Sequence, residues 1–168
     1  GFVEVIRKAR GLGATDICFA SSGSTGEPTR STLSPQMLMD EIEGHLSFLP
    51  AFGRVVSTVP PHHIYGFIWT VLLPGTADAG VIDIRYKGTG ETDKQKFNHG
   101  DLIVSHPQYW RYLARSTGSF HGANGISSAG ALPADLRNQL LEQGVEALYE
   151  IYGSTETGGL AYRCNTSA

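Results

Sequence analysis

The chain has 168 residues, of which 40% are hydrophobic and 17% charged, and this composition is typical of a globular domain rather than a disordered or membrane-spanning one. Its 13 Lys and Arg residues against 16 Asp and Glu residues give a formal net charge of −3, which argues against nucleic acid or an anionic membrane as a partner. Cys18 and Cys164 form neither a disulfide framework nor a metal-ligand spacing, and the first residues show no signal-peptide pattern, so we expect a reduced, cytoplasmic setting.

The first predicted elements surround a loop rich in glycine and hydroxyl residues. Residues 1–15 form a basic lead-in, helical or irregular, and the apolar residues 16–20 predict a buried strand that contains Cys18. This strand runs into Ser-Ser-Gly-Ser-Thr-Gly-Glu-Pro at residues 21–28, whose backbone N–H groups and hydroxyls can surround a phosphate. It is not a Walker P-loop, because no Gly-Lys pair follows the glycines. Taken alone, such a loop is more often a flexible surface turn.

A helix and further strands follow the loop. Residues 31–33 predict a short strand, and Ser34 with Pro35 predicts the start of a helix that continues to Pro50 with one apolar stripe. The β-branched residues 54–59 predict a strand. Residues 64–73 are apolar nearly all round and predict a buried helix that stops before Pro74 and is too short to span a membrane.

The second half of the sequence alternates strands and helices. We predict strands at 81–86, 102–104, 125–128, 147–151 and 158–162, helices at 107–115 and 133–143, and a polar loop or short polar helix at 87–98. Alternation at this spacing favours an α/β fold with a mainly parallel sheet flanked by helices.

Three later stretches carry residues suited to chemistry. Residues 59–66 read Val-Pro-Pro-His-His-Ile-Tyr-Gly, residues 127–133 read Ser-Ser-Ala-Gly-Ala-Leu-Pro, and residues 150–156 read Glu-Ile-Tyr-Gly-Ser-Thr-Glu. The histidine doublet could be a metal pair, but adjacent side chains point apart and no further ligand stands at suitable spacing, so a half-buried polar group is the plainer interpretation. Tyr152 offers a flat face for a purine, and a single carboxylate such as Glu156 suits Mg²⁺ beside a nucleotide.

Together, and in this order, the four stretches resemble the core motifs of the adenylate-forming superfamily, which includes acyl-CoA synthetases, aryl-CoA ligases, luciferases and the adenylation domains of peptide synthetases. The resemblance covers residues 16–163. It implies ATP and Mg²⁺ as cofactors and a carboxylic acid that is activated as an acyl or aryl adenylate with release of pyrophosphate. Coenzyme A, or the phosphopantetheine of an acyl carrier protein, would then accept the acyl group.

The resemblance also implies a role for each matching residue. Catalytic roles fall to His63, Thr155 and Glu156, and Glu156 would also hold the metal ion. The acid would be bordered by His63, Tyr65, Phe67, Ser128 and Ala129. The nucleotide would be held by Ser22, Gly23, Ser24, Thr25, Gly26, Ala129, Gly130, Tyr152, Gly153 and Thr155. The family's loop lysine is replaced here by Thr29, and Arg30, one residue later, is the candidate phosphate cation.

Residues 1–168 are expected to be a single, partial AMP-binding domain, because the family's ribose-binding aspartate and C-terminal domain with its lysine do not follow in this sequence. Residues 59–74 are most similar to bacterial ligases that activate hydroxybenzoate-type acids for aryl polyene pigments, which favours an aryl acid. Three alternatives stay open. They are a fatty acyl-CoA synthetase, a non-catalytic nucleotide- or acyl-adenylate-binding module, and an α/β domain with no nucleotide role.

Overall fold

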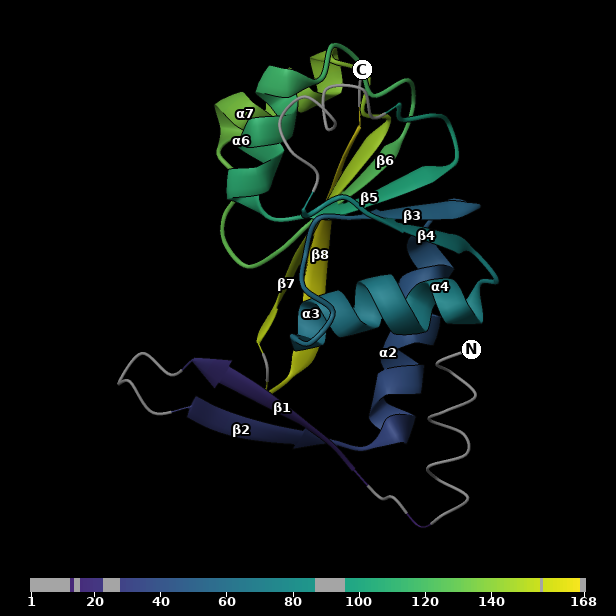
Figure 1. Ribbon diagram of the computed structural model, residues 1–168, viewed down its shortest axis with the longest axis vertical. Helices are drawn as coiled ribbons and strands as arrows, with labels where there is room; N and C mark the ends of the chain where they lie inside the picture. The colour runs from purple at the N-terminus through teal and green to yellow at the C-terminus, as the bar shows by residue number, and fades with distance from the viewer. Residues whose placement is uncertain (1–12, 14–15, 23–27, 87–95, 155, 167–168) are drawn as a thin grey trace.

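A six-stranded sheet forms the centre of the protein, with strand order β4-β3-β5-β6-β7-β8 (Figure 1). The computed structural model describes residue 13 and residues 16–22, 28–86, 96–154 and 156–166, so the predicted lead-in and most of the polar stretch at 87–98 lie outside the described residues. Strands β3 to β7 are parallel to one another, and β8 is antiparallel to β7. Their bounds are Arg54–Ser57 (β3), Gly80–Asp83 (β4), Asp101–Ser105 (β5), Asn124–Ser127 (β6), Ala147–Ser154 (β7) and Gly158–Thr166 (β8).

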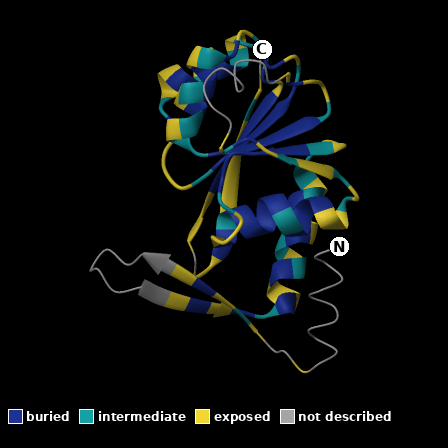
Figure 2. Cartoon of the chain, in the orientation of Figure 1, coloured by how far each residue is buried: buried dark blue, intermediate teal, exposed yellow. Residues whose placement is uncertain are grey.

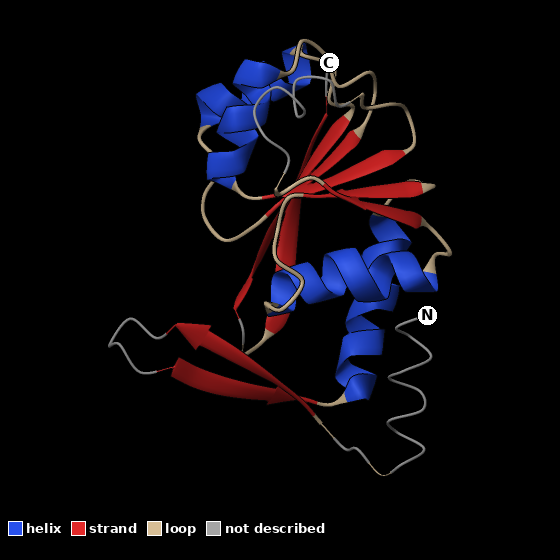
Figure 3. Cartoon of the chain, in the orientation of Figure 1, coloured by secondary structure: helices blue, strands red, loops and turns tan. Residues whose placement is uncertain are grey.

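Helices cover both faces of this sheet (Figure 3). One face carries α6 (Pro107–Ser116) and α7 (Ala134–Glu142), and the other carries α2 (Pro35–Phe48) and the helical run α3 (Ile64–Phe67), η1 (Ile68–Leu72) and α4 (Leu73–Thr76). None of the helices in the described ranges is long and apolar enough to cross a membrane. The predicted α/β fold with a mainly parallel, helix-flanked sheet is confirmed.

Two hydrophobic cores result, one on each side of the sheet. Trp69 is buried in the core beneath α2 and η1, and Trp110 in the core beneath α6 and α7. The strands β5 and β6 are buried on both faces, as parallel strands between helical layers must be. By contrast, β8 is exposed over most of its length (Figure 2).

The first two strands form a separate antiparallel pair rather than part of the main sheet. Strand β1 (Ile17–Ser22) pairs with β2 (Pro28–Leu33), so β2 begins three residues earlier than predicted. Successive side chains of a strand point to opposite faces. Phe19 therefore packs inward against Phe67, with ring centroids 5.4 Å apart, while Cys18 is exposed. The prediction that Cys18 is buried was wrong because only one face of this hairpin is covered.

The predicted helix at 64–73 continues through Pro74 to Thr76, and its middle turn is a π-helix. Proline normally breaks a helix because it lacks the N–H that bonds four residues back. Here the Leu73 N–H donates to the Ile68 carbonyl, five residues back, so the hydrogen-bonding register has already shifted before the proline. The wider turn explains why Pro74 does not end the helix.

Candidate functional site

The carboxyl ends of four strands are tied together by side-chain hydrogen bonds. The Tyr65 hydroxyl donates to the Ser105 carbonyl at the end of β5, at 2.8 Å, and lies 3.4 Å from the Ile126 carbonyl in β6. The Ser128 hydroxyl, just after β6, donates to the Ile151 carbonyl of β7 at 3.0 Å. Thr58, just after β3, donates to the Ser105 hydroxyl at 2.8 Å. Ligand sites of open α/β sheets form at this edge.

A cavity of about 230 Å³ opens beside these strand ends. It brings together residues from three of the sequence motifs, namely His63 and Tyr65, Ser128 and Ala129, and Gly153. Its remaining wall is formed by Glu41, Ile64, Ile68, Trp69, Ile151, Ser154, Gly158 and Gly159. The cavity is therefore mostly apolar, with a few polar groups, as binding sites for small organic molecules are.

Phe67 does not reach this cavity. Its ring is buried in the core and packs against Phe19, and Phe67 is absent from the residues that line the cavity.

Tyr65 lines the cavity with its ring and anchors the ring through its hydroxyl. Burial raises the pKa of the Tyr65 phenol well above its ordinary value, partly offset by its hydrogen bond to the Ser105 backbone. The hydroxyl therefore stays protonated at neutral pH and remains a donor to the two strands. Its ring is held at the cavity wall by β5 and β6.

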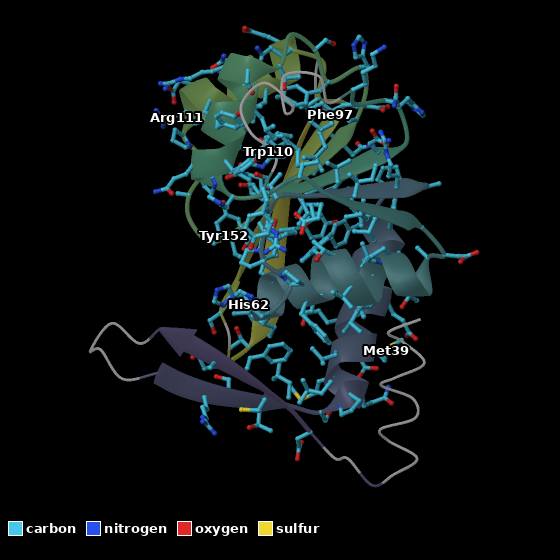
Figure 4. The ribbon with its side chains drawn as sticks, viewed as in Figure 1. Met39, His62, Phe97, Trp110, Arg111 and Tyr152 are labelled. Atoms are coloured by element: carbon cyan, nitrogen blue, oxygen red, sulfur yellow. The ribbon has the colours of Figure 1, made fainter. Side chains whose placement is uncertain are left out.

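His63 is the residue that precedes α3, and the centroid of its ring lies 4.4 Å from that of His62. Loss of hydration and the neighbouring His62 both lower the pKa of His63, so its imidazole is neutral at pH 7 and can donate or accept a hydrogen bond. Across the ranges that the structure describes, no group of three or more His, Cys, Asp or Glu side chains that could hold a metal ion is found. His62 and Tyr152 both lie between the β1–β2 hairpin and the main sheet in the view of Figure 4.

The segment after β6 has an unusual backbone conformation at the cavity. Ala129 has a φ of 63° and Gly130 a φ of 150°. A left-handed conformation costs a non-glycine residue free energy, and such residues gather at functional sites. Ala129 is exposed, and the ring of Tyr152 is 45% exposed at the end of β7, so both surfaces are accessible to a ligand.

The turn between β7 and β8 is held by its own hydroxyl groups. The Ser154 N–H donates to the Thr157 hydroxyl at 3.2 Å, and the Glu156 N–H donates to the Ser154 hydroxyl at 3.2 Å. A hydrogen bond from the Ser154 side chain lowers the pKa of the exposed Glu156 carboxyl, which is therefore ionised at neutral pH. Thr155 lies outside the described residues.

The backbone of Gly153 approaches Gly158 closely across this turn. A Cβ at Gly153 would overlap the Gly158 carbonyl oxygen and lie 2.8 Å from its carbon. Only glycine fits there without a shift of the turn that carries Glu156.

Of the predicted phosphate loop, the structure describes only the two ends. Ser22 is the last residue of β1, described by its backbone alone, and Gly23, Ser24, Thr25 and Gly26 lie outside the described residues. Arg30 lies in β2 opposite Ala20, with an exposed side chain on the same face as Cys18 and Thr32.

Sequence reasoning missed Glu41 and Gly159 as cavity residues. Glu41 lies in α2 three residues after Leu38 and four before His45, which are both buried. A charged residue at that spacing lies beside the buried stripe and is normally solvent-facing, so spacing alone does not place Glu41 at a cavity.

The sequence and the fold were then compared with known proteins. The sequence model of the AMP-binding enzyme family matches residues 13–168. A 4-coumarate–CoA ligase from Halorhodospira halophila is 40% identical over 147 residues, which cover 88% of this chain and 37% of that protein. A 4-coumarate–CoA ligase from Rhodobacter capsulatus is 35% identical over 149 residues, covering 86% and 38% of the two chains. This chain thus spans little more than a third of these relatives.

Solved structures show the same fold at lower identity. O-succinylbenzoate coenzyme A synthetase from Bacillus subtilis, in complex with ATP and magnesium ion, aligns with a TM-score of 0.72 at 15% identity, over 92% of this chain and 34% of that one. MatB from Rhodopseudomonas palustris with ATP bound aligns with a TM-score of 0.70 at 20% identity, over 89% of this chain and 31% of that one. With a family match over nearly its whole length and the same fold, the chain belongs to the AMP-binding family of adenylate-forming enzymes.

Proposed function

We propose that the full-length protein activates a carboxylic acid with ATP and transfers the acyl group to a thiol. The observation that carries this proposal is the cavity at the carboxyl edge of the sheet, where residues of three separate motifs meet. Membership of the AMP-binding family and the relatives named 4-coumarate–CoA ligase support it. Coenzyme A is the acceptor that those names favour, and a carrier-protein phosphopantetheine is the alternative.

In the first step, a carboxylate oxygen of the acid attacks the α-phosphorus of ATP, and the bond to the pyrophosphate oxygen breaks. The protein's contribution is to hold the two reactants in line and to stabilise the developing charge. We propose that His63, Tyr65 and Ser128 border the bound acid. The neutral imidazole of His63 can donate a hydrogen bond to the acid without adding a fixed charge.

The nucleotide would lie against the β7 end of the cavity. Tyr152 has an accessible ring for the adenine, and Ala129 and Gly130 present backbone without bulky side chains. The phosphates would be bound by residues 22–26, by Thr155 and by Arg30. Thiol attack on the adenylate carbonyl then forms the thioester and releases AMP.

Glu156 fits a magnesium role. Its carboxylate is exposed and ionised, and Mg²⁺ bound to a nucleotide uses one or two protein carboxylates together with phosphate and water oxygens. The ion would neutralise phosphate charge during the transfer.

Glu156→Gln should therefore weaken the binding of Mg–ATP, and so raise the Mg²⁺ concentration needed for half-maximal exchange, without unfolding the protein. A neutral amide is a poor ligand for Mg²⁺, and a direct ligand should matter at least as much as outer-shell groups, whose loss costs about tenfold or more in metal affinity. Titration of Mg²⁺ in the pyrophosphate-exchange reaction would measure the effect, with Glu142→Gln, an exposed site at the end of α7, as the control. An unchanged Mg²⁺ dependence would remove Glu156 from this role.

The cavity of about 230 Å³ in the described residues can hold a compact aromatic ring. Trp69 and Tyr65 supply aromatic walls. We therefore propose an aryl acid of the hydroxybenzoate or hydroxycinnamate type as the substrate.

We further propose that residues 1–168 are the central part of the large N-terminal domain and adenylate poorly by themselves. The alternative, a non-catalytic nucleotide-binding module, is favoured by one observation, namely that Arg30 has an exposed side chain on the outer face of its hairpin. Acid-dependent turnover by the full-length protein distinguishes the two.

A further inference from the structure

Glu41 places a carboxylate at the wall of the cavity. Its side chain, from the middle of α2, is only 14% exposed and is one of the residues that line the cavity. Burying a charged group this far is unfavourable unless it is hydrogen-bonded. The hydrogen-bond partners of its two oxygens therefore show whether either oxygen can accept a further hydrogen bond.

The two oxygens of Glu41 differ. Oε1 accepts a hydrogen bond from the Gly159 N–H at 2.7 Å and lies 3.2 Å from His45 Nε2. Oε2 has no hydrogen-bond donor among the residues that the structure describes. It lies against Gly158, where a Cβ would overlap it and come within 2.9 Å of the carboxyl carbon. The glycine pair in β8 thus leaves room for this carboxylate.

Much of the cavity wall that Glu41 shares is apolar. Ile64, Ile68, Trp69 and Ile151 line the same cavity as Glu41, and no lysine or arginine lines it within the described ranges. An acceptor oxygen in such a wall is satisfied either by water or by a donor on the bound molecule. A site built this way rejects molecules that lack the donor, because its own acceptor would be left unpaired.

Glu41 and His63 reach the cavity from different elements, since Glu41 lies in α2 and contacts β8 whereas His63 precedes α3. His45, which contacts Glu41, stacks on Trp69 with ring centroids 4.4 Å apart. Trp69 follows His63 by six residues along the helical run, which is roughly 9 Å along the axis. A compact aryl acid whose carboxylate lies near His63 would direct its opposite ring position toward Glu41.

We propose that Glu41 determines substrate specificity by accepting a hydrogen bond from a donor group on the ring of the acid, para to the carboxylate or its side chain. A phenolic O–H and an anilinic N–H are both hydrogen-bond donors that could fill this role. The inference rests on the proposed acid activation and adds the substituent that the acid must carry.

The test compares acids that differ only in this group. Acid-dependent ATP–pyrophosphate exchange by the full-length protein would be measured with benzoate, 4-hydroxybenzoate and 4-aminobenzoate, and with cinnamate against 4-coumarate. We expect kcat/KM to favour the donor-bearing acid of each set by about tenfold or more. The amino and hydroxyl compounds distinguish the two sources of the donor.

The variant Glu41→Gln keeps an acceptor for the Gly159 N–H and nearly the same shape, but it removes the charge. Because hydrogen bonds to an ionised acceptor are roughly twice as strong as those to a neutral acceptor, a preference of about tenfold should fall to about threefold, through a lower kcat/KM for the donor-bearing acid. Glu43→Gln is the matched control, since Glu43 is an exposed residue of the same helix. Equal thermal unfolding temperatures of the two variants would show that Glu41→Gln is folded.

The possible failures are distinct. An unchanged preference in Glu41→Gln, or a wild-type protein that favours benzoate and cinnamate, would overturn the role of Glu41 and leave acid activation standing. Absence of exchange with every acid would overturn the proposed function, and the role of Glu41 with it.

Discussion

Replacing Gly66 with alanine should lower the free energy of unfolding by about 3 kcal/mol, the upper part of the range for overpacked sites. Gly66 is a buried residue of α3, and a Cβ there would overlap the Pro60 carbonyl oxygen and lie 2.8 Å from the Pro60 carbonyl carbon. The obstacle is backbone, which cannot rotate away as a side chain can. The segment between β3 and α3, which carries His62 and His63, would have to move.

Urea denaturation followed by the fluorescence of the two tryptophans would measure this, since Trp69 and Trp110 are both buried. Gly44→Ala is the control. Gly44 is exposed in α2, and apart from adjoining residues and the backbone of its own helix no atom lies within 4 Å of the place that an alanine Cβ would take. Alanine should therefore stabilise the helix by about 0.5–1 kcal/mol. An unchanged midpoint for Gly66→Ala would mean that the close approach to Pro60 is absent in solution.

Replacing Glu150 with alanine should destabilise the protein by about 2–3 kcal/mol, somewhat below the range for the loss of one partner of a fully buried ion pair. Glu150 is 4% exposed in β7 and receives two hydrogen bonds of 2.8 Å from Arg163 of β8. Arg137 of α7 reaches the same carboxylate at 3.3 Å, and Asn165 at 3.2 Å. We place the loss below that range because the Arg163 side chain is 50% exposed and can return to water.

Glu146→Ala is the matched control for Glu150→Ala. Glu146 lies 3.5 Å from His99, and both side chains are more than half exposed. Exposed pairs contribute about 0–1 kcal/mol, so this change should have little effect. Equal denaturation midpoints for the two variants would show that the buried network around Glu150 does not hold β8 to the sheet.

The sequence predicted most of the sheet because its strands carry local signals. Residues 102–104 are a short apolar run and residues 147–151 are mostly apolar. Both predicted strands, together with the one predicted at 125–128, form parallel strands of the sheet. The length of β8 was underestimated, because residues 163–166 are polar and are kept in the strand by pairing with β7 rather than by their own propensity.

Features set by distant contacts could not be predicted in this way. The hairpin β1–β2 is separate from the main sheet, and only its Phe19 face packs against the helices. No local sequence pattern predicts this arrangement. Glu41 bonds to Gly159, 118 residues further along the chain, and a periodicity argument treats a charged residue beside an apolar stripe as solvent-facing. The part that Glu41 plays in the cavity wall therefore depends on the contact between α2 and β8, which only the folded structure shows.

The most direct test of acid activation is acid-dependent ATP–pyrophosphate exchange by the full-length protein, with residues 1–168 measured in parallel. Hydroxybenzoates, hydroxycinnamates and fatty acids of graded length would serve as substrates. We predict exchange by the full-length protein that is fastest with a hydroxylated aryl acid, and little or none by residues 1–168 alone. Absence of exchange by the full-length protein with every acid, despite saturable binding of ATP, would contradict the account and favour a non-catalytic nucleotide-binding module.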